Sequence, residues 1–447
     1  MPLFQAFQRK AFAVCVSAAL VLAPIGVAAQ SLIRDADIEY GLRQVAQPIF
    51  QAAGLSGNTK IYIIADSSLN AFVINNRSVF LHSGLLARFE TPGPVQAVLA
   101  HEAAHIANGH LARRAANFGT ARTAAGFGIA LAIAAAAVGG ADAGIGVAAG
   151  TGSAAMRQFF AHTRAEEASA DQSALRYMAT AGVDPAETLK VLDLIRGQEA
   201  LSVTRRDPYA ITHPLTRDRY RAVQGLVAAL TVTPRDQTRA TYFYQRSMGK
   251  LTAFLRAPSW TFRRVGRKTD EISTMRRAIA YHRQPDANKA IAEMQKLLAM
   301  KPNDPFYREL YGQILLESRQ VGAAVQAYRQ AATGAPGEPL ILAGLGRALL
   351  AQNTASSNRE ALTVLTRARG RDPSDPRMLR DLALAHARAG QNGLASVATA
   401  ERYALQGRLD DAELHANRAV GILPQGSRGA LRAQDVLSAV KRAKQRR

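Results

Sequence analysis

The stretch Val95-Gln-Ala-Val-Leu-Ala-His-Glu-Ala-Ala-His-Ile-Ala107 places an H-E-x-x-H motif inside an apolar run that contains neither Pro nor Gly. The run predicts a helix from about Val95 to beyond Leu111. Residues four apart share one face of a helix, so His101 and His105 can aim two imidazole rings at one metal ion. Glu102 lies beside them, where it can deprotonate a water activated by that metal. The pattern favours peptide hydrolysis at zinc, and a chance match on an amphipathic helix is the competing explanation.

The whole chain has 447 residues and a formal net charge of +22. This length predicts two or three domains. The basic charge is compatible with nucleic acid, anionic lipid or an acidic protein partner.

Residues 1–29 are typical of a cleavable signal peptide, with a basic start, an apolar run and small residues before Gln30. The sole cysteine, Cys15, lies within this segment. The exported chain would therefore have no cysteine, which excludes thiol catalysis and a Cys-ligated metal.

Residues 30–235 form the first predicted domain. Apolar residues at helical spacing predict a helix over 31–54, and the sequence around 60–65 predicts a strand. One or two further strands are expected over 70–82, with a turn at Asn75-Asn76, and a short helix is expected to begin at Ser83.

An Ala/Gly-rich segment over 123–156 carries only one charged residue, Asp142. Three interpretations stay open: a packed or lid-like hairpin near the active site, a contact with a membrane surface, or a bilayer span.

A second helix supplies the candidate for the third metal ligand. Glu167 and Asp171 are four residues apart and share a face. Glu167 is expected to ligate the metal, and Asp171 to accept the free N–H of a ligating His and fix its tautomer. A solvated acidic turn is the competing interpretation, because Glu166 and Glu167 cannot both point inward.

The stretch 205–277 is strongly basic, with sixteen Lys and Arg against five Asp and Glu. It includes His213. Considered alone, His213 is best interpreted as a loop residue that precedes the rigid Pro214. Its later part, over 236–270, shows no clean helical or strand pattern and is predicted to be a basic connector. The cations are either a solvated face or a docking surface for an anionic partner.

Residues 271–447 change to helix pairs with a recurring register. Pro302 and Pro336 are 34 residues apart, and Ala and Tyr residues recur at matching positions before them. This spacing predicts tetratricopeptide repeats, with an ordinary helical bundle as the alternative. Residues 376–392 fit as an unpaired or degenerate helix, and 427–447 as a basic capping helix.

In order, these motifs resemble those of the HtpX/Oma-type gluzincin metalloproteases. The matching segments are Asn70-Ala71-Phe72, Ser83-Gly84-Leu85-Leu86, the H-E-x-x-H motif, Glu167-Ala168-Ser169-Ala170-Asp171 and His213-Pro214. With a signal peptide before them and repeats after them, the chain looks like the periplasmic BepA type of this family. The resemblance implies a mainly α fold: a gluzincin-type zinc peptidase domain with a small β-sheet, followed by an α-solenoid.

The resemblance also implies roles for individual residues. One Zn²⁺ per chain would be held by His101, His105 and Glu167, and Glu102 would be the general base. His213 and Arg219 match the family's H-P-x(4)-R element near the active site. His213, with Arg219, would stabilise the oxyanion, or a neutral His213 would ligate zinc and keep the enzyme latent.

The function implied is a periplasmic zinc endopeptidase in the quality control and assembly of outer-membrane proteins. Its partners would be unfolded or misassembled protein substrates, the envelope assembly machinery through the repeats, and a membrane surface by peripheral contact. A nucleic-acid role is not expected of an exported chain. The alternative is a repeat-based chaperone or scaffold with minor or latent proteolysis.

Overall fold

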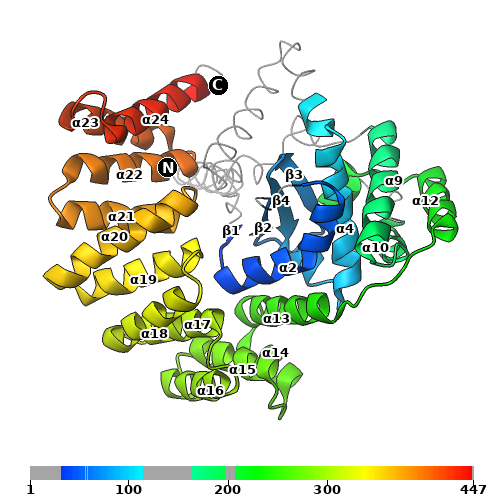
Figure 1. Ribbon diagram of the computed structural model, residues 1–447, viewed down its shortest axis with the longest axis horizontal. Coiled ribbons are helices and arrows are strands. Elements are labelled where there is room, and N and C mark those ends of the chain that lie inside the picture. The colour runs from blue at the N-terminus through cyan, green and yellow to red at the C-terminus, as the bar shows by residue number, and fades with distance from the viewer. Residues whose placement is uncertain are drawn as a thin grey trace, which may run out of the picture.

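A four-stranded sheet with helices packed against it forms the first part of the molecule, and stacked helix pairs form the rest (Figure 1). The computed structural model describes residues 32–55, 57, 59–113, 163–197, 201 and 207–444. The predicted signal peptide and the Ala/Gly-rich segment lie outside the described residues. The mainly α fold class with a small sheet and a repeat solenoid is confirmed.

The sheet has the strand order β1-β2-β4-β3, so β3 lies at an edge. Its strands are β1 (Leu32–Ile33), β2 (Lys60–Ile64), β3 (Ala71–Asn75) and β4 (Ser78–His82). β3 and β4 form the expected hairpin, and the Asn75 side chain accepts a hydrogen bond from the Arg77 backbone N–H at 2.8 Å. β2 runs parallel to β4, and both strands are almost fully buried.

Three long helices pack on one another beside the sheet and share one hydrophobic core with it. They are α2 (Ala36–Ala52), α4 (Pro92–Ala107) and α9 (Arg164–Ala181). Shorter helices complete this part: α3 (Ser83–Leu86), α10 (Glu187–Ile195), α11 (Pro208–Thr212) and α12 (Arg217–Ala229). Because α4 is buried on nearly every side, the motif that it carries lies inside the domain.

The stretch predicted as a connector without regular structure is helical. It contains α13 (Thr238–Leu255) and α14 (Pro258–Val265), and α13 packs on both α2 and α15 (Glu271–Arg283). Two cations on the inner face of α13 are buried: Arg246 is 2% exposed and Lys250 is 0% exposed. Arg246 pairs with Asp37 at 2.9 Å and with Asp304 at 2.5 Å, so α13 joins α2 to the repeats.

The repeats form five helix pairs. They are α15 with α16 (Ala287–Met300), α17 (Pro305–Glu317) with α18 (Val321–Gly334), α19 (Pro339–Gln352) with α20 (Ala355–Arg371), α21 (Pro376–Arg388) with α22 (Asn392–Leu405), and α23 (Leu409–Ile422) with α24 (Arg428–Lys444). Of the two interpretations of 376–392, the unpaired helix is wrong, because α21 packs against α22. Tyr328 sets the close approach of one pair to the next: a Cβ at Gly344 would lie 2.4 Å from its ring.

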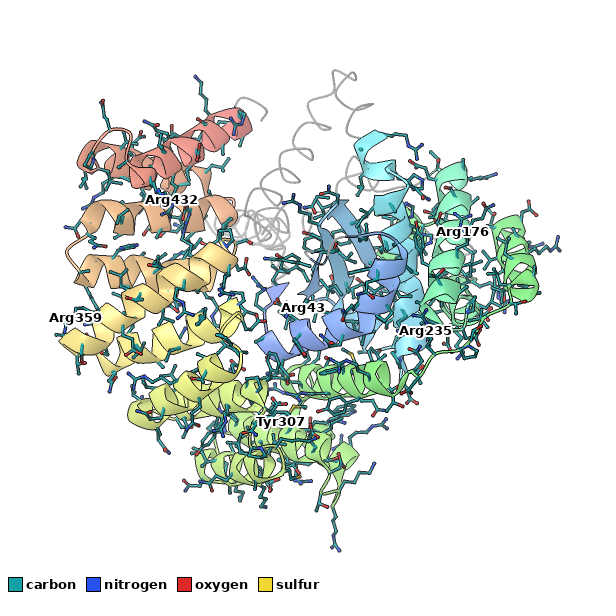
Figure 2. All side chains as sticks on the ribbon, viewed as in Figure 1. Arg43, Arg176, Arg235, Tyr307, Arg359 and Arg432 are labelled. Atoms are coloured by element: carbon teal, nitrogen blue, oxygen red, sulfur yellow. The ribbon has the colours of Figure 1, made fainter. Side chains whose placement is uncertain are left out.

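The solenoid also contacts the first part of the molecule directly. Arg43 on α2 pairs with Glu338 at 3.0 Å (Figure 2), and Arg34 pairs with Asp372 at 2.6 Å. Within the described residues, no helix is both long enough and apolar enough to cross a membrane.

Candidate metal centre

Helix α4 places the two motif histidines on one inward face. The imidazole Nε2 atoms of His101 and His105 are 3.0 Å apart, as their spacing of one helical turn requires. Glu102, on the same turn, is 0% exposed. The helix ends at Ala107, because Gly109 has a left-handed φ of 69°. The predicted helix to beyond Leu111 is therefore interrupted by a turn at 108–109, and residues 110–113 are again helical.

Helix α9 brings the acidic pair against those histidines. A capping box between Thr163 and Glu166 starts the helix, and it holds Glu166 at the exposed end. Glu167 is consequently the inward carboxylate, with its oxygens 3.5 Å from His101 Nε2 and 3.4 Å from His105 Nε2. Asp171 lies one turn further along, where Oδ1 is 3.1 Å from His101 Nδ1.

His213 enters the cluster from the end of α11. The segment is anchored to the sheet side, since the Asp207 carboxylate accepts a hydrogen bond from the Leu69 backbone N–H at 3.0 Å. His213 Nδ1 lies 3.0 Å from a Glu167 oxygen, and Nε2 lies 3.4 Å from a Glu102 oxygen. His213 follows α11 in the loop before Pro214, as the loop interpretation has it, but it is as deeply buried as the residues on the two long helices.

Four buried residues each offer one ligand atom, and these atoms all lie within 4.8 Å of one another: His101, His105, Glu167 and His213. Three imidazole nitrogens and one carboxylate oxygen are a donor set that suits zinc. The arrangement has the chemistry of a metal site, with Glu102 beside it as a further carboxylate.

Arg219, near the start of α12, is tied to the acidic residues. Its Nε and Nη2 donate to the Asp171 carboxylate at 2.7 and 2.9 Å, and its Nη1 lies 2.5 Å from Glu167. Nη1 also donates to the Pro214 carbonyl oxygen at 3.0 Å. With every nitrogen of the guanidinium used in this way, Arg219 holds α9 and the segment after His213 together.

The electrostatics of the cluster favour a positive charge between the carboxylates. Burial lowers the pKa of His105 well below its ordinary value, which leaves its ring neutral and able to ligate. Burial opposes ionisation of Glu167, but His213 and the Arg219 guanidinium outweigh it and hold the pKa of that carboxyl well below its usual range. Burial opposes protonation of His101, but the Glu167 and Asp171 carboxylates outweigh it and raise the pKa of that ring to about 10. Metal binding requires neutral imidazole, so a metal bound here would displace a proton from His101 but not from His105.

Two residues near the centre were not predicted as part of it. The His110 ring, buried beyond the break at Gly109, has Nδ1 2.9 Å from His105 Nδ1, so it contacts the far side of a candidate ligand. The Tyr209 ring is packed at 4.5 Å from the His213 ring. Gly109 was the sequence signal for this contact. A continuous helix would place His110 off the metal face, but a helix break at a glycine lets its side chain turn back toward His105.

Comparison with known proteins shows which families and proteins this chain resembles. Residues 35–227 match the model of peptidase family M48, and residues 354–404 match a tetratricopeptide repeat model. The beta-barrel assembly-enhancing protease of Escherichia coli K12 is 25% identical over 359 residues, which cover 78% of this chain and 72% of that protein. The protein of the same name from Yersinia pestis is 24% identical and covers 82% of this chain and 74% of its own length. A solved tetratricopeptide-repeat protein of Thermus thermophilus aligns with 38% of this chain and 100% of its own, at 19% identity and a TM-score of 0.28.

Proposed function

Because the chain is a metalloprotease with a peptidase family M48 domain and tetratricopeptide repeats, homologous to the beta-barrel assembly-enhancing protease, we propose that it is a zinc endopeptidase of the bacterial periplasm. Its task would be the quality control and assembly of outer-membrane β-barrel proteins. The observation that carries the proposal is the buried cluster of His101, His105, Glu167 and His213 with Glu102 beside it.

One zinc ion per chain would be held by His101, His105 and Glu167. Zinc supplies Lewis acidity, which polarises a carbonyl oxygen and lowers the pKa of water. Glu102 accepts the proton of the attacking water and passes it to the leaving amine. Asp171 accepts the Nδ1 proton of His101, which leaves Nε2 free to ligate and fixes the ring orientation.

We propose two alternative roles for His213, which lies in the cluster of candidate ligands. Its ring could donate to the oxyanion of the tetrahedral intermediate, or it could be a fourth ligand that keeps the enzyme latent. We assign Arg219 a positioning role, because its guanidinium is engaged by Asp171 and Glu167. The edge position of β3, which contacts α4, suits a substrate that adds as an extended strand.

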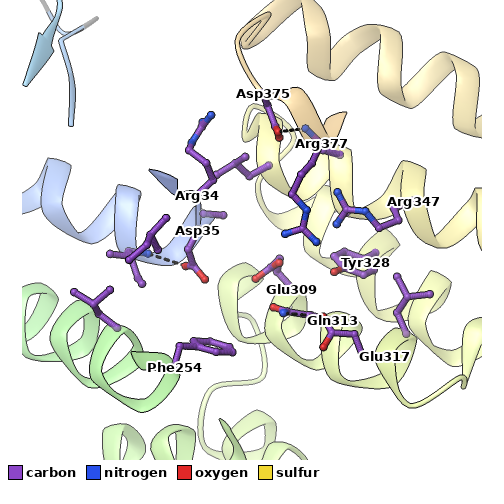
Figure 3. Close-up of a pocket in the computed structure, with 18 of the residues that line it drawn as sticks. Arg34, Asp35, Phe254, Glu309, Gln313, Glu317, Tyr328, Arg347, Asp375 and Arg377 are labelled. Carbon is purple, nitrogen blue, oxygen red and sulfur yellow. Dashed lines mark hydrogen bonds between the residues drawn. The ribbon is translucent and has the colours of Figure 1, made fainter. Parts of the chain in front are cut away.

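The repeats would supply a docking surface beside the peptidase domain. A cavity of about 500 Å³ lies between the segment Ile33–Ile38, α13 and the helices α17, α19 and α21 (Figure 3). Phe254 and Tyr328 contribute apolar surface, and Arg377 reaches in from α21 (Figure 3). A segment of a protein substrate or partner bound there would contact both parts of the molecule, and this favours the scaffold role as the second candidate function.

The test is to measure bound zinc and casein cleavage for the exported chain and for Glu102→Gln. Stoichiometric zinc in both, with cleavage only by the wild type, is the expected result. Zinc without cleavage would make His213→Ala the next variant: a gain of cleavage identifies latency, and unchanged cleavage with an unchanged metal-site spectrum excludes it. Full function of Glu102→Gln in a deletion strain would favour the scaffold instead.

A further inference from the structure

The basic stretch that the peptidase site does not use contains a cavity of its own. Helices α13, α14 and α15 (Figure 1), with the loop over 87–90, line a cavity of about 760 Å³. Trp260, Arg264, Lys268 and Arg276 line it, together with the acidic residues Glu90 and Asp270. The cavity therefore has an excess of positive charge around an aromatic side chain.

Arg276 is the inner cation of this cavity. Its Nε is buried and makes no hydrogen bond to any described residue. Its guanidinium carbon lies 5.5 Å from the centre of the Trp260 ring, in the range of a cation–π contact. Burial, and then the neighbouring Arg264, lower the pKa of Arg276. A half-buried cation beside a like charge is a position that an anion would stabilise.

The surrounding surface adds further cations. Arg256, Arg263 and Arg267 are exposed, and among the described residues no carboxylate forms an ion pair with them. Arg264 has Glu90 at 3.7 Å, but that carboxylate side chain is 89% exposed and holds it only weakly. We name this surface the basic corner, and it consists of Arg256, Trp260, Arg263, Arg264, Arg267, Lys268 and Arg276.

We propose that the basic corner binds the phosphate groups of anionic lipid headgroups, which places the protein peripherally on a membrane surface. Arg264 and Arg276 would hold one phosphate in the cavity, and the exposed arginines would add electrostatic attraction. Clusters of four to eight Lys and Arg on an amphipathic element are typical of such contacts, and Trp prefers the headgroup region.

A lipid surface fits this corner better than a nucleic acid does. Leu255, next to Arg256, is 45% exposed and Phe262 is partly exposed, and the boundary of a bilayer accepts such apolar side chains. The corner shares no residue with the metal centre. Failure of this proposal would consequently leave the peptidase assignment intact, and the reverse also holds.

Trp260 is the only tryptophan of the chain, so its fluorescence reports on the corner directly. We expect its emission to shift to the blue with phosphatidylglycerol-containing vesicles and not with pure phosphatidylcholine vesicles. Loss of two cations in Arg264→Gln/Arg276→Gln should weaken vesicle binding roughly 25-fold, at about fivefold for each arginine near an anionic surface. An unchanged far-UV circular dichroism spectrum and an unchanged urea unfolding midpoint of this variant would show that it is folded.

The matched control removes two exposed arginines from the outer edge of the solenoid, where Figure 2 labels Arg359. Arg359→Gln/Arg367→Gln should bind vesicles like the wild type. If the cavity variant does not fold, the exposed pair Arg263→Gln/Arg267→Gln tests the same surface and should show a similar loss.

Three outcomes would overturn the proposal. One is an equal loss of binding in the control, which would indicate a diffuse effect of net charge. A second is the same Trp260 shift with inorganic phosphate alone, at concentrations too low to act by screening, which would indicate a small phosphorylated ligand. The third is tighter binding of a single-stranded oligonucleotide than of the anionic vesicles at the same salt concentration.

Discussion

Asp372→Asn should loosen the contact between the solenoid and the first part of the molecule. Asp372 follows α20 and is 2% exposed, and its carboxylate lies 2.6 Å from Arg34 Nη2 and 3.2 Å from Lys60 Nζ. Arg34 is itself almost buried and comes just before α2. The substitution keeps the shape of the side chain but removes the charge that both cations face.

The size of the effect follows from burial. Removing one partner of a buried ion pair costs about 3–5 kcal/mol, because the other charge stays buried without compensation. Arg34 retains Glu39 at 2.6 Å and the Lys60 side chain is 40% exposed, so the lower end applies. A loss of about 3 kcal/mol corresponds to a change of roughly 150-fold in the equilibrium for local opening.

Hydrogen exchange with mass spectrometry measures this opening without requiring two-state unfolding of the whole chain. Protection in peptides covering 32–40 and 370–380 should fall by about that factor, while peptides of α4 stay unchanged. Glu360→Gln is the control, because its pair with Arg329 is exposed on both sides and is worth at most about 1 kcal/mol. A loss in Asp372→Asn no larger than in this control would refute the reasoning.

The same contact predicts a dependence on pH. Burial opposes ionisation of Asp372, but Arg34 and Lys60 outweigh it and hold its pKa well below the usual value. A carboxyl with a lowered folded-state pKa stabilises the fold above its unfolded pKa of about 4, and this stabilisation is lost as the pH falls below that value. Protection of the two peptides, corrected for intrinsic exchange, should be constant above about pH 5 and fall on acidification in the wild type. In Asp372→Asn this fall should be absent.

Three further substitutions, one of them with a matched control, test other parts of the structure. Asp171→Asn should weaken metal binding by about 10–100-fold in a chelator competition, because the variant no longer offers a charged acceptor to His101; unchanged affinity would exclude the positioning role. Tyr244→Phe removes a hydroxyl that donates to the Leu86 carbonyl oxygen at 2.9 Å, and should lower stability to urea by about 1–2 kcal/mol. Gly346→Ala would put a Cβ 2.4 Å from Leu365 and should cost about 1–3 kcal/mol, whereas Gly370→Ala, with nothing within 4 Å, should be neutral or slightly stabilising in the same urea assay.

Helices and strands whose apolar residues recur with a single regular spacing were predicted well from the sequence. The strand over 60–64, the hairpin around Asn76 and the repeat helices all bury a continuous stripe that belongs to one element. The helix α13 was missed because its buried face includes Arg246 and Lys250. A pattern analysis assigns cations to the solvent, and only the fold shows that Asp37 and Asp304 compensate Arg246, and that Asp35 lies 2.9 Å from Lys250.

In the candidate site, too, the features that depend on one helix could be predicted from the sequence, and those that depend on contacts between distant segments could not. The spacing of His101 and His105, and of Glu167 and Asp171, is a property of a single helix, so the sequence alone placed each pair on one face. The approach of the two pairs depends on residues distant in the sequence. Arg219 contacts both carboxylates of α9 and offsets part of the repulsion between Glu167 and Asp171 in their buried position.

Arg219 also constrains the backbone that carries the His213 ring. Its Nη1 donates to the Pro214 carbonyl oxygen at 3.0 Å and to that of His213 at 3.4 Å, so the backbone beside His213 is fixed to α9 by the same guanidinium. Release of a latent His213 by movement of the whole segment would have to break these contacts, but rotation of the side chain alone would not. Arg219→Lys retains the charge but loses the planar set of donors that holds this backbone. The variant should therefore increase cleavage only if release of His213 requires movement of its backbone segment.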